Sequence, residues 1–202
     1  LDDEQEEVVS DAARALGASM TYTYNVDHAA VFNSPASTVG SPDGVALFST
    51  AHPLVGGGTG SNTFATQQDL SISSLRDALN VMADTVDDAG KLLHIRPTIL
   101  LVPYELKWLA KEITMSAGRP DTADRADNVM KDEGLKVVAW PYLTDADAWF
   151  LLTDPKNHNV RSYDREKANV LHDWDFESSS FKVKIRARWI RGWSDYKGTF
   201  GS

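Results

Sequence analysis

The five histidines are the residues of this chain best suited to acid–base or metal chemistry, because the sequence contains no cysteine. They are His28, His52, His94, His158 and His172. No two of them have the i, i+4 spacing with which a helix presents paired zinc ligands. The lack of cysteine also excludes disulfides, thiolate nucleophiles and Cys-type zinc sites. We therefore expect neither a metal site nor a cofactor.

His52, in the segment Thr50–Pro53, has the most specific setting of these histidines. We expect it to fix a loop by hydrogen bonding rather than to act in catalysis. The other candidate is the pair Asp27 and His28, in which the carboxylate of Asp27 would orient His28 as a base. Neighbouring residues on a helix point about 100° apart, so this spacing favours the interpretation of His28 as an ordinary surface or core histidine.

Three further patterns resemble binding motifs but lack essential parts. Asp121, Asp124 and Asp127 are three residues apart, whereas a calcium loop needs ligands at alternate positions. Asp145 and Asp147 alternate, but the glycine and closing glutamate of a calcium loop do not follow. The GGGTG segment at 56–60 lacks the Lys-Ser/Thr of a phosphate-binding loop, and no G-x-S-x-G elbow of a hydrolase is present. These patterns predict solvated loops rather than catalysis.

Residues 181–189 show the clearest strand pattern in the chain, with apolar and basic side chains in alternation. The basic face consists of Lys182, Lys184, Arg186 and Arg188. Four like charges on one strand face repel each other unless an acidic group covers them. A solvated edge strand is one interpretation, since lysines commonly protect exposed edges. A docking surface for an acidic partner is the other.

The chain carries such an acidic partner itself, in residues 2–7. Its glutamates are Glu4, Glu6 and Glu7. We predict that they face the basic strand of the same or a neighbouring copy, so that the two charged groups form a self-assembly site. Nucleic acid is a third partner to consider, but the net charge of −9 disfavours it.

Hydrophobic periodicity predicts the elements that carry these residues. A long helix is expected over residues 1–34, and a second helix after a cap at Ser71 or Asp69. Residues 98–102 form an unbroken apolar run, typical of a strand covered on both faces, and a helix follows Pro103. Residues 135–140 and 148–153 read as short strands, whereas 35–69 read as a long loop and 193–202 as turns.

The fold class that this order of elements predicts is α+β. At 202 residues with 42% hydrophobic content, the chain is long enough and apolar enough for a packed core. No apolar run approaches the roughly 20 residues of a membrane helix, so we expect no membrane partner.

The motifs, taken in order, resemble major capsid proteins of tailed phages, with the major head subunit of Mu-like prophages as the most similar variety. The most specific are DG-x-x-LF-S-T-x-HP at 43–53 and GKLLHIRPTILLVPYELKWLA at 90–110. Asn62 after the glycine-rich loop, the W-F-L-L strand at 149–152 and the charged final strand extend the resemblance over nearly the whole chain.

The resemblance implies the tailed-phage major capsid fold, with a long spine helix and a long strand in a peripheral domain. Residues 1–34 and about 161–202 would form that domain, and 35–64 a Gly/Ser-rich loop. Residues from about 65 to 160 would form an axial domain, a mixed sheet with flanking helices. The family's N-terminal arm and extended loop are expected before residue 1.

The implied function is structural and not enzymatic. Copies would assemble into hexamers and pentamers of an icosahedral shell around double-stranded DNA, which is bound only non-specifically. Portal, scaffold and maturation protease are the implied partners, with the virion as the location and the bacterial host cytoplasm as the place of assembly. Two alternatives remain: an encapsulin-like shell around a protein cargo, and an α/β enzyme with a polar pocket at His52 or Asp43.

Overall fold

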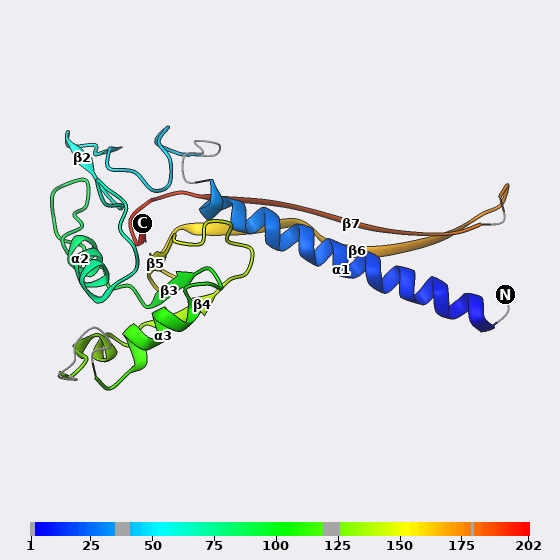
Figure 1. The fold of residues 1–202 in the computed structure, drawn as a ribbon. Helices are drawn as coiled ribbons and strands as arrows, with labels where there is room; N and C mark the ends of the chain where they lie inside the picture. Colours follow the sequence, from blue (N-terminus) through cyan, green and yellow to red (C-terminus); the bar gives the residue numbers. More distant parts are fainter. Residues whose placement is uncertain (1–2, 35–40, 119–125, 179) are drawn as a thin grey trace. The chain divides into compact units, whose positions relative to one another are not determined.

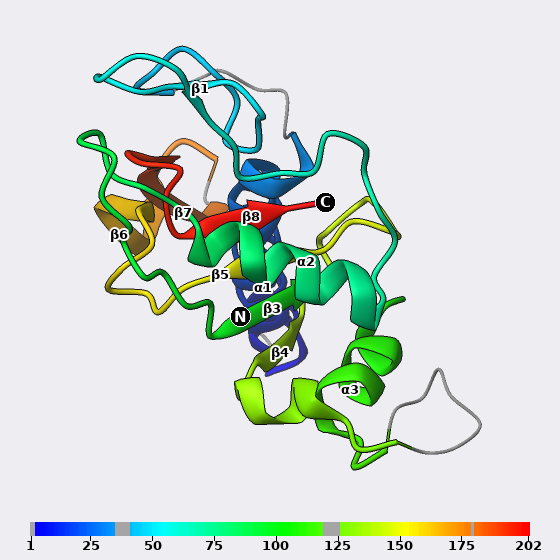
Figure 2. The same cartoon turned by 90° about the vertical axis from the view of Figure 1, so that its left-hand side faces the viewer.

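The computed structural model describes residues 3–34, 41–118, 126–178 and 180–202 of the chain. Its contacts divide the chain into two compact units. The first comprises Leu1–Ala30 and Arg161–Arg191, and the second comprises Val31–Val160 and Gly192–Ser202. Figures 1 and 2 together label the helices and strands of both units.

A long helix and a two-stranded ribbon make up the first unit. Helix α1 runs over Asp3–Asn33, which confirms the predicted long helix, and its last residues belong to the second unit. Strands β6 (Val160–Asp175) and β7 (Ser180–Trp193) pair with each other. This ribbon runs alongside α1 (Figure 1).

Strand β7 has the alternation that its sequence predicts. The apolar residues from Phe181 to Trp189 are half-buried, whereas the basic residues between them are exposed. Ile185 points to α1, because its side chain ends 4.0 Å from where a Cβ on Gly17 would lie. Strand β6 was not predicted, since polar and charged residues occupy both of its faces and leave no period of two.

A four-stranded mixed sheet forms the centre of the second unit. Its strands are β3 (Ile99–Val102), β4 (Lys136–Ala139), β5 (Phe150–Leu152) and β8 (Thr199–Gly201), in the order β4-β3-β5-β8. The β3–β4 pair is parallel, and the β3–β5 and β5–β8 pairs are antiparallel. Strand β8 lies where the sequence predicts turns, because a three-residue strand with a terminal glycine carries almost no pattern of its own.

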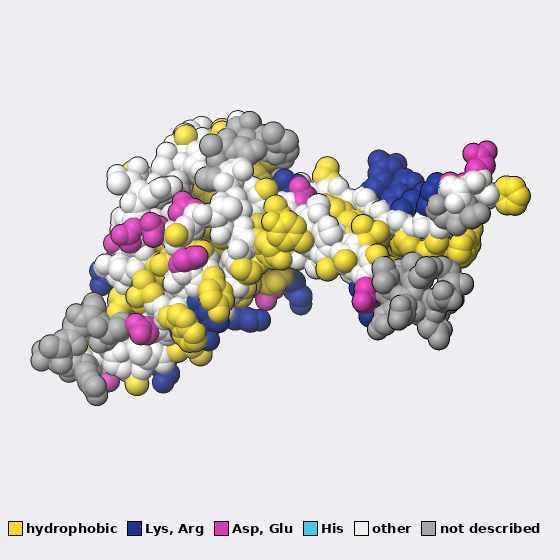
Figure 3. Space-filling model, turned by 45° about the vertical axis from the view of Figure 1, so that its right-hand side comes forward, with side chains coloured by type: hydrophobic (Ala, Val, Ile, Leu, Met, Phe, Trp, Pro, Cys, Tyr) yellow, Lys and Arg dark blue, Asp and Glu magenta, His cyan; other side chains and the backbone are white. Residues whose placement is uncertain are grey.

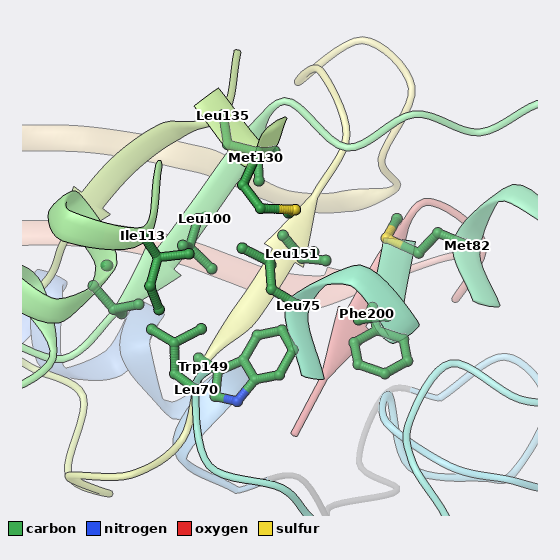
Figure 4. Close-up of a cluster of buried hydrophobic side chains, with 13 residues drawn as sticks. Leu70, Leu75, Met82, Leu100, Ile113, Met130, Leu135, Trp149, Leu151 and Phe200 are labelled. Carbon is green, nitrogen blue, oxygen red and sulfur yellow. The ribbon is translucent and has the colours of Figure 1, made fainter. Parts of the chain in front are cut away.

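Helices and a 3₁₀ turn cover one face of this sheet (Figure 2). They are α2 (Ile72–Ala83), α3 (Lys107–Met115) and η1 (Val129–Glu133). Ser71, one of the two predicted caps, is the residue that caps α2, and it forms a capping box with Ser74. Figure 4 shows the resulting core, in which Leu100, Leu151 and Phe200 from three strands meet Leu75 of α2. Trp149 is fully buried in the same cluster.

The opposite face of the sheet is also covered, as the apolar run at 98–102 predicts. The side chains on this face are those of Leu101, Phe150 and Leu152, which alternate along their strands with residues of the first face. They pack against Phe32 and Leu143. A strand residue points to the opposite face from its neighbour, so each central strand is buried on both sides.

The segment from residue 41 to residue 70 connects α1 to α2 without long elements. It contains only the short pair β1 (His52–Pro53) and β2 (Thr59–Gly60), which confirms the predicted loop for its described part. Among the helices that the structure describes, none is long and apolar enough to cross a membrane.

Candidate functional site

His52 and Asp43 do come together, as the interpretation of His52 as a loop-fixing residue requires. The Nδ1 atom of His52 lies 2.7 Å from Oδ2 of Asp43, and its Nε2 lies 3.2 Å from the backbone oxygen of Leu47. The His52 side chain is fully buried. These hydrogen bonds confirm that His52 stabilises the turn formed by residues 43–52.

Asn62 extends this arrangement to the C-terminal segment. Its Nδ2 donates to the backbone oxygen of Leu47 at 2.7 Å and to Oγ1 of Thr199 at 3.3 Å. The backbone N–H of Ser49 donates to Asn62 Oδ1, which fixes the orientation of the amide. His52 Nε2 lies 3.2 Å from that same Oδ1. The oxygens that face the imidazole are acceptors, so a ring nitrogen that carries a proton donates to this network.

The environment of Asp43 changes the acidity of its carboxyl group. Partial burial by itself raises the pKa, but hydrogen bonds from His52, Ser41 and the backbone of Val45 outweigh it, so the pKa lies below its usual 3.8. The carboxylate is thus the stable form at neutral pH. A base for catalysis would need to reach a substrate, and here Tyr196 and Trp193 stack on or abut the His52 ring. We conclude that this cluster holds the loop in place.

Asp27 and His28 bind different parts of the ribbon rather than each other. Asp27 accepts a hydrogen bond from Trp189 Nε1 at 2.7 Å and forms an ion pair with Arg191. His28 lies 2.7 Å from the backbone oxygen of Tyr24 through Nδ1, and its Nε2 contacts Oγ of Ser162. The helical argument against a catalytic pair is confirmed, and both residues tie α1 to the ribbon.

The basic face of β7 is partly neutralised within its own ribbon. Lys182 pairs with Asp175 at 2.5 Å, and Arg186 pairs with Glu166 at 3.1 Å. Lys184 is exposed and forms no ion pair within the described residues.

The remaining predicted assembly residues lie in two places. Arg188 is exposed on β7 and likewise forms no ion pair among the described residues. Glu4, Glu6 and Glu7 belong to the first turns of α1, and their side chains lie outside the described part of the structure. The predicted contact between the two charged groups stays a prediction.

The hollows of the second unit differ in their lining: one collects His94, Asp195 and Lys197, and another is mostly uncharged. The mostly uncharged hollow, of about 290 Å³, is lined by aromatic residues that include Phe32, Phe48 and Phe150, together with polar residues. Its one ionisable lining residue in the described part of the chain is Asp145, whose carboxylate accepts the N–H of Asp147. Across the ranges that the structure describes, no three His, Asp or Glu side chains could hold a metal ion. Asp121 and Asp124 lie outside those ranges.

Comparison with known proteins supplies the family. A family model described as phage capsid protein matches residues 1–200. The chain belongs to the phage capsid protein family. No curated protein and no solved structure matches the chain.

Membership of this family assigns the phage capsid protein a structural role and a place in the virion. Its α+β fold, with a mixed sheet and flanking helices, is compatible with that role. For a capsid protein, the residues that matter are those that other copies can contact. Sequence patterns located the basic face of β7 but missed the large apolar side chains that this capsid protein exposes on α3 and on the ribbon. The isolated aromatic residues there carry no periodic signal.

Proposed function

We propose that the chain is the major head subunit of a tailed phage or Mu-like prophage. Copies assemble into hexamers and pentamers of an icosahedral shell that encloses double-stranded DNA. The observation that carries the proposal is the family match over residues 1–200, since it spans both units of the structure. Assembly takes place in the cytoplasm of the bacterial host.

The surface of a single copy supports assembly with further copies. Large apolar side chains are exposed in both units, which is costly for a protein that stays alone. In the first unit they include Tyr163, Val170, Trp174, Phe176 and Ile190. The ribbon that carries them has only two strands, and such ribbons need packing partners for stability.

Charge adds to this surface at the basic face of β7. Lys184 and Arg188 have no acidic partner within the described part of their own copy, in contrast to Lys182 and Arg186. In the proposed shell, the acidic start of α1 from the same or a neighbouring copy covers this face. Packaged DNA is held only weakly, because a chain with a net charge of −9 repels phosphate overall.

Portal, scaffold and maturation protease are the further partners that fit the proposed role. An encapsulin-like compartment would use a similar shell for a protein cargo and would need none of the packaged DNA. Nuclease treatment of particles purified from a producing culture separates the two. Protected double-stranded DNA of uniform length is the expected result, and particles that contain only protein would contradict the phage-head assignment.

A further inference from the structure

The tip of the ribbon is unusually apolar for a turn. Residues 173–177, here called the ribbon tip, read Asp-Trp-Asp-Phe-Glu. Phe176 is 98% exposed and Trp174 is 57% exposed. Turns usually carry small or polar residues that suit a tight backbone, so the exposed Phe176 in this turn is suited to be an interface anchor. Trp174, at the end of β6, lies against Phe181 with ring centroids 5.4 Å apart. Figure 3 shows hydrophobic and acidic side chains at this end of the ribbon.

The ribbon tip is also acidic. Asp175 is neutralised by its bond to Lys182, which stabilises the turn. Asp173 and Glu177 form no ion pair within the described residues, and both are exposed. The tip therefore presents two aromatic rings and two carboxylates that form no ion pair among the described residues.

A second surface, in the other unit, has the opposite character. Tyr104, Trp108 and Met115 are 55%, 63% and 64% exposed and lie along one side of α3 and the turn before it. We call these three residues the α3 stripe. Aromatic residues and methionine are enriched at interface centres, and the described residues of its own unit leave the stripe exposed.

Two lysines border the α3 stripe. The Nζ atom of Lys107 lies 4.7 Å from the ring centroid of Tyr104 and 5.0 Å from that of Trp108. Lys111 Nζ lies 5.3 Å from the Trp108 centroid. Neither lysine forms an ion pair with a carboxylate in the described part of the chain. By the helical period, Glu112 lies on the other side of Trp108, so the lysine side is the one that favours an acidic partner.

We propose that the ribbon tip of one copy docks onto the α3 stripe of a second copy. Phe176 and Trp174 pack against Trp108 and Tyr104, while Asp173 and Glu177 face the two lysines. Aromatic residues bury roughly 150–250 Å² each, so four rings supply the centre of a modest contact. This inference rests on the proposed function, and it names one contact through which the shell is built.

The two surfaces differ, so each copy uses one to bind a neighbour and offers the other to the next. Contacts of this head-to-tail kind close into rings when the rotation allows, which suits capsomers. A two-fold dimer, by contrast, would bring identical patches together. The arrangement also predicts that defects in the two surfaces can complement each other between copies.

The test uses two charge-reversal variants of the complete gene product. One is Lys107→Glu/Lys111→Glu on α3, and the other is Asp173→Lys/Glu177→Lys on the ribbon tip. The fraction of protein in sedimenting particles is measured for each variant and for a 1:1 co-expression of both. Lys91→Glu/Lys156→Glu, at two exposed lysines elsewhere in the second unit, is the matched control. Circular dichroism melts verify that each variant is folded.

Each variant alone should lose at least tenfold of its assembled fraction, and co-expression should restore most of it. Restoration arises because the reversed stripe of one variant then meets the reversed tip of the other. Full assembly of both single variants would overturn the inference, and so would two defects that co-expression does not repair, since that pattern indicates contact within one copy. Wild-type protein that forms no particles would instead count against the proposed function itself.

Discussion

Tyr196 lies flat on His52, with ring centroids 3.9 Å apart and an angle of 4° between the ring planes. His52 is simultaneously hydrogen-bonded to Asp43, so the stack joins the 43–52 turn to the segment that leads into β8. Two parts of the chain more than 140 residues apart are thus held by one buried ring. The stack leaves little free space beside Gly60, which faces the Tyr196 hydroxyl.

Substitution of Gly60 tests how tightly this stack is packed. A Cβ at position 60 would lie 2.0 Å from the hydroxyl oxygen of Tyr196. Gly60→Ala should therefore destabilise the second unit by roughly 1–3 kcal/mol, a typical effect of overpacking. Urea unfolding of the unassembled subunit, followed by tryptophan fluorescence, measures this change. Gly192→Ala, where a Cβ meets nothing within 4 Å, should show no loss. An unchanged midpoint for Gly60→Ala would contradict the tight stack.

Acid should loosen the same cluster through Asp43. Its pKa is held below 3.8 by its hydrogen bonds, so the folded state favours the carboxylate. The stability that this group contributes is present above pH 3.8 and is lost as the pH falls through the lower folded pKa. Unfolding free energies measured from pH 6 to pH 2.5 should fall less steeply in Asp43→Asn than in wild type. Asp164→Asn, an exposed control on β6, should follow the wild-type curve.

Asp27 tests how the ribbon is attached to α1. Asp27→Ala removes both the hydrogen bond from Trp189 and the ion pair with Arg191. Charged hydrogen bonds contribute about 1.5–3 kcal/mol, so amide hydrogen exchange should accelerate over residues 181–191. The control is Asp11→Ala, because the Asp11–Arg14 pair is well exposed and such pairs contribute about 0–1 kcal/mol. Equal exchange in both variants would refute the attachment.

Reversal of the basic face of β7 tests its proposed role in assembly. Lys184→Glu/Arg186→Glu should lower the yield of assembled particles, because the acidic start of α1 would then meet like charges. Arg165→Glu/Lys167→Glu on β6 reverses the same number of exposed charges and should have the smaller effect. Gradient sedimentation gives both yields. Unaltered assembly of the β7 variant would show that this face makes no contact needed for assembly.

Elements with a strong local period could be predicted from the sequence. The apolar run before Pro103, the capping box at Ser71 and the alternation in β7 each determine their structure within a few residues. Strand β6 could not be predicted in this way. Its partner is β7 and both of its faces carry polar groups, so pairing rather than pattern determines its conformation.

In the candidate sites, too, local contacts could be predicted and contacts between distant segments could not. His52 and Asp43 are nine residues apart, so a contact that fixes this turn could be predicted from the local sequence. The stack with Tyr196 and the bond from Trp189 to Asp27 join distant segments, and nothing local specifies either pair. Exposure of Phe176 and Trp108 depends on what the fold leaves uncovered, so only the structure could point to them.

The central claim is that many copies of this chain build a closed shell. Electron microscopy of the sedimenting fraction, after expression of the complete gene with any segment encoded before residue 1, tests it most directly. Closed particles of uniform diameter are expected, with both five-fold and six-fold capsomers in their images. Well-folded protein that stays monomeric even when expressed with its neighbouring phage genes would contradict it.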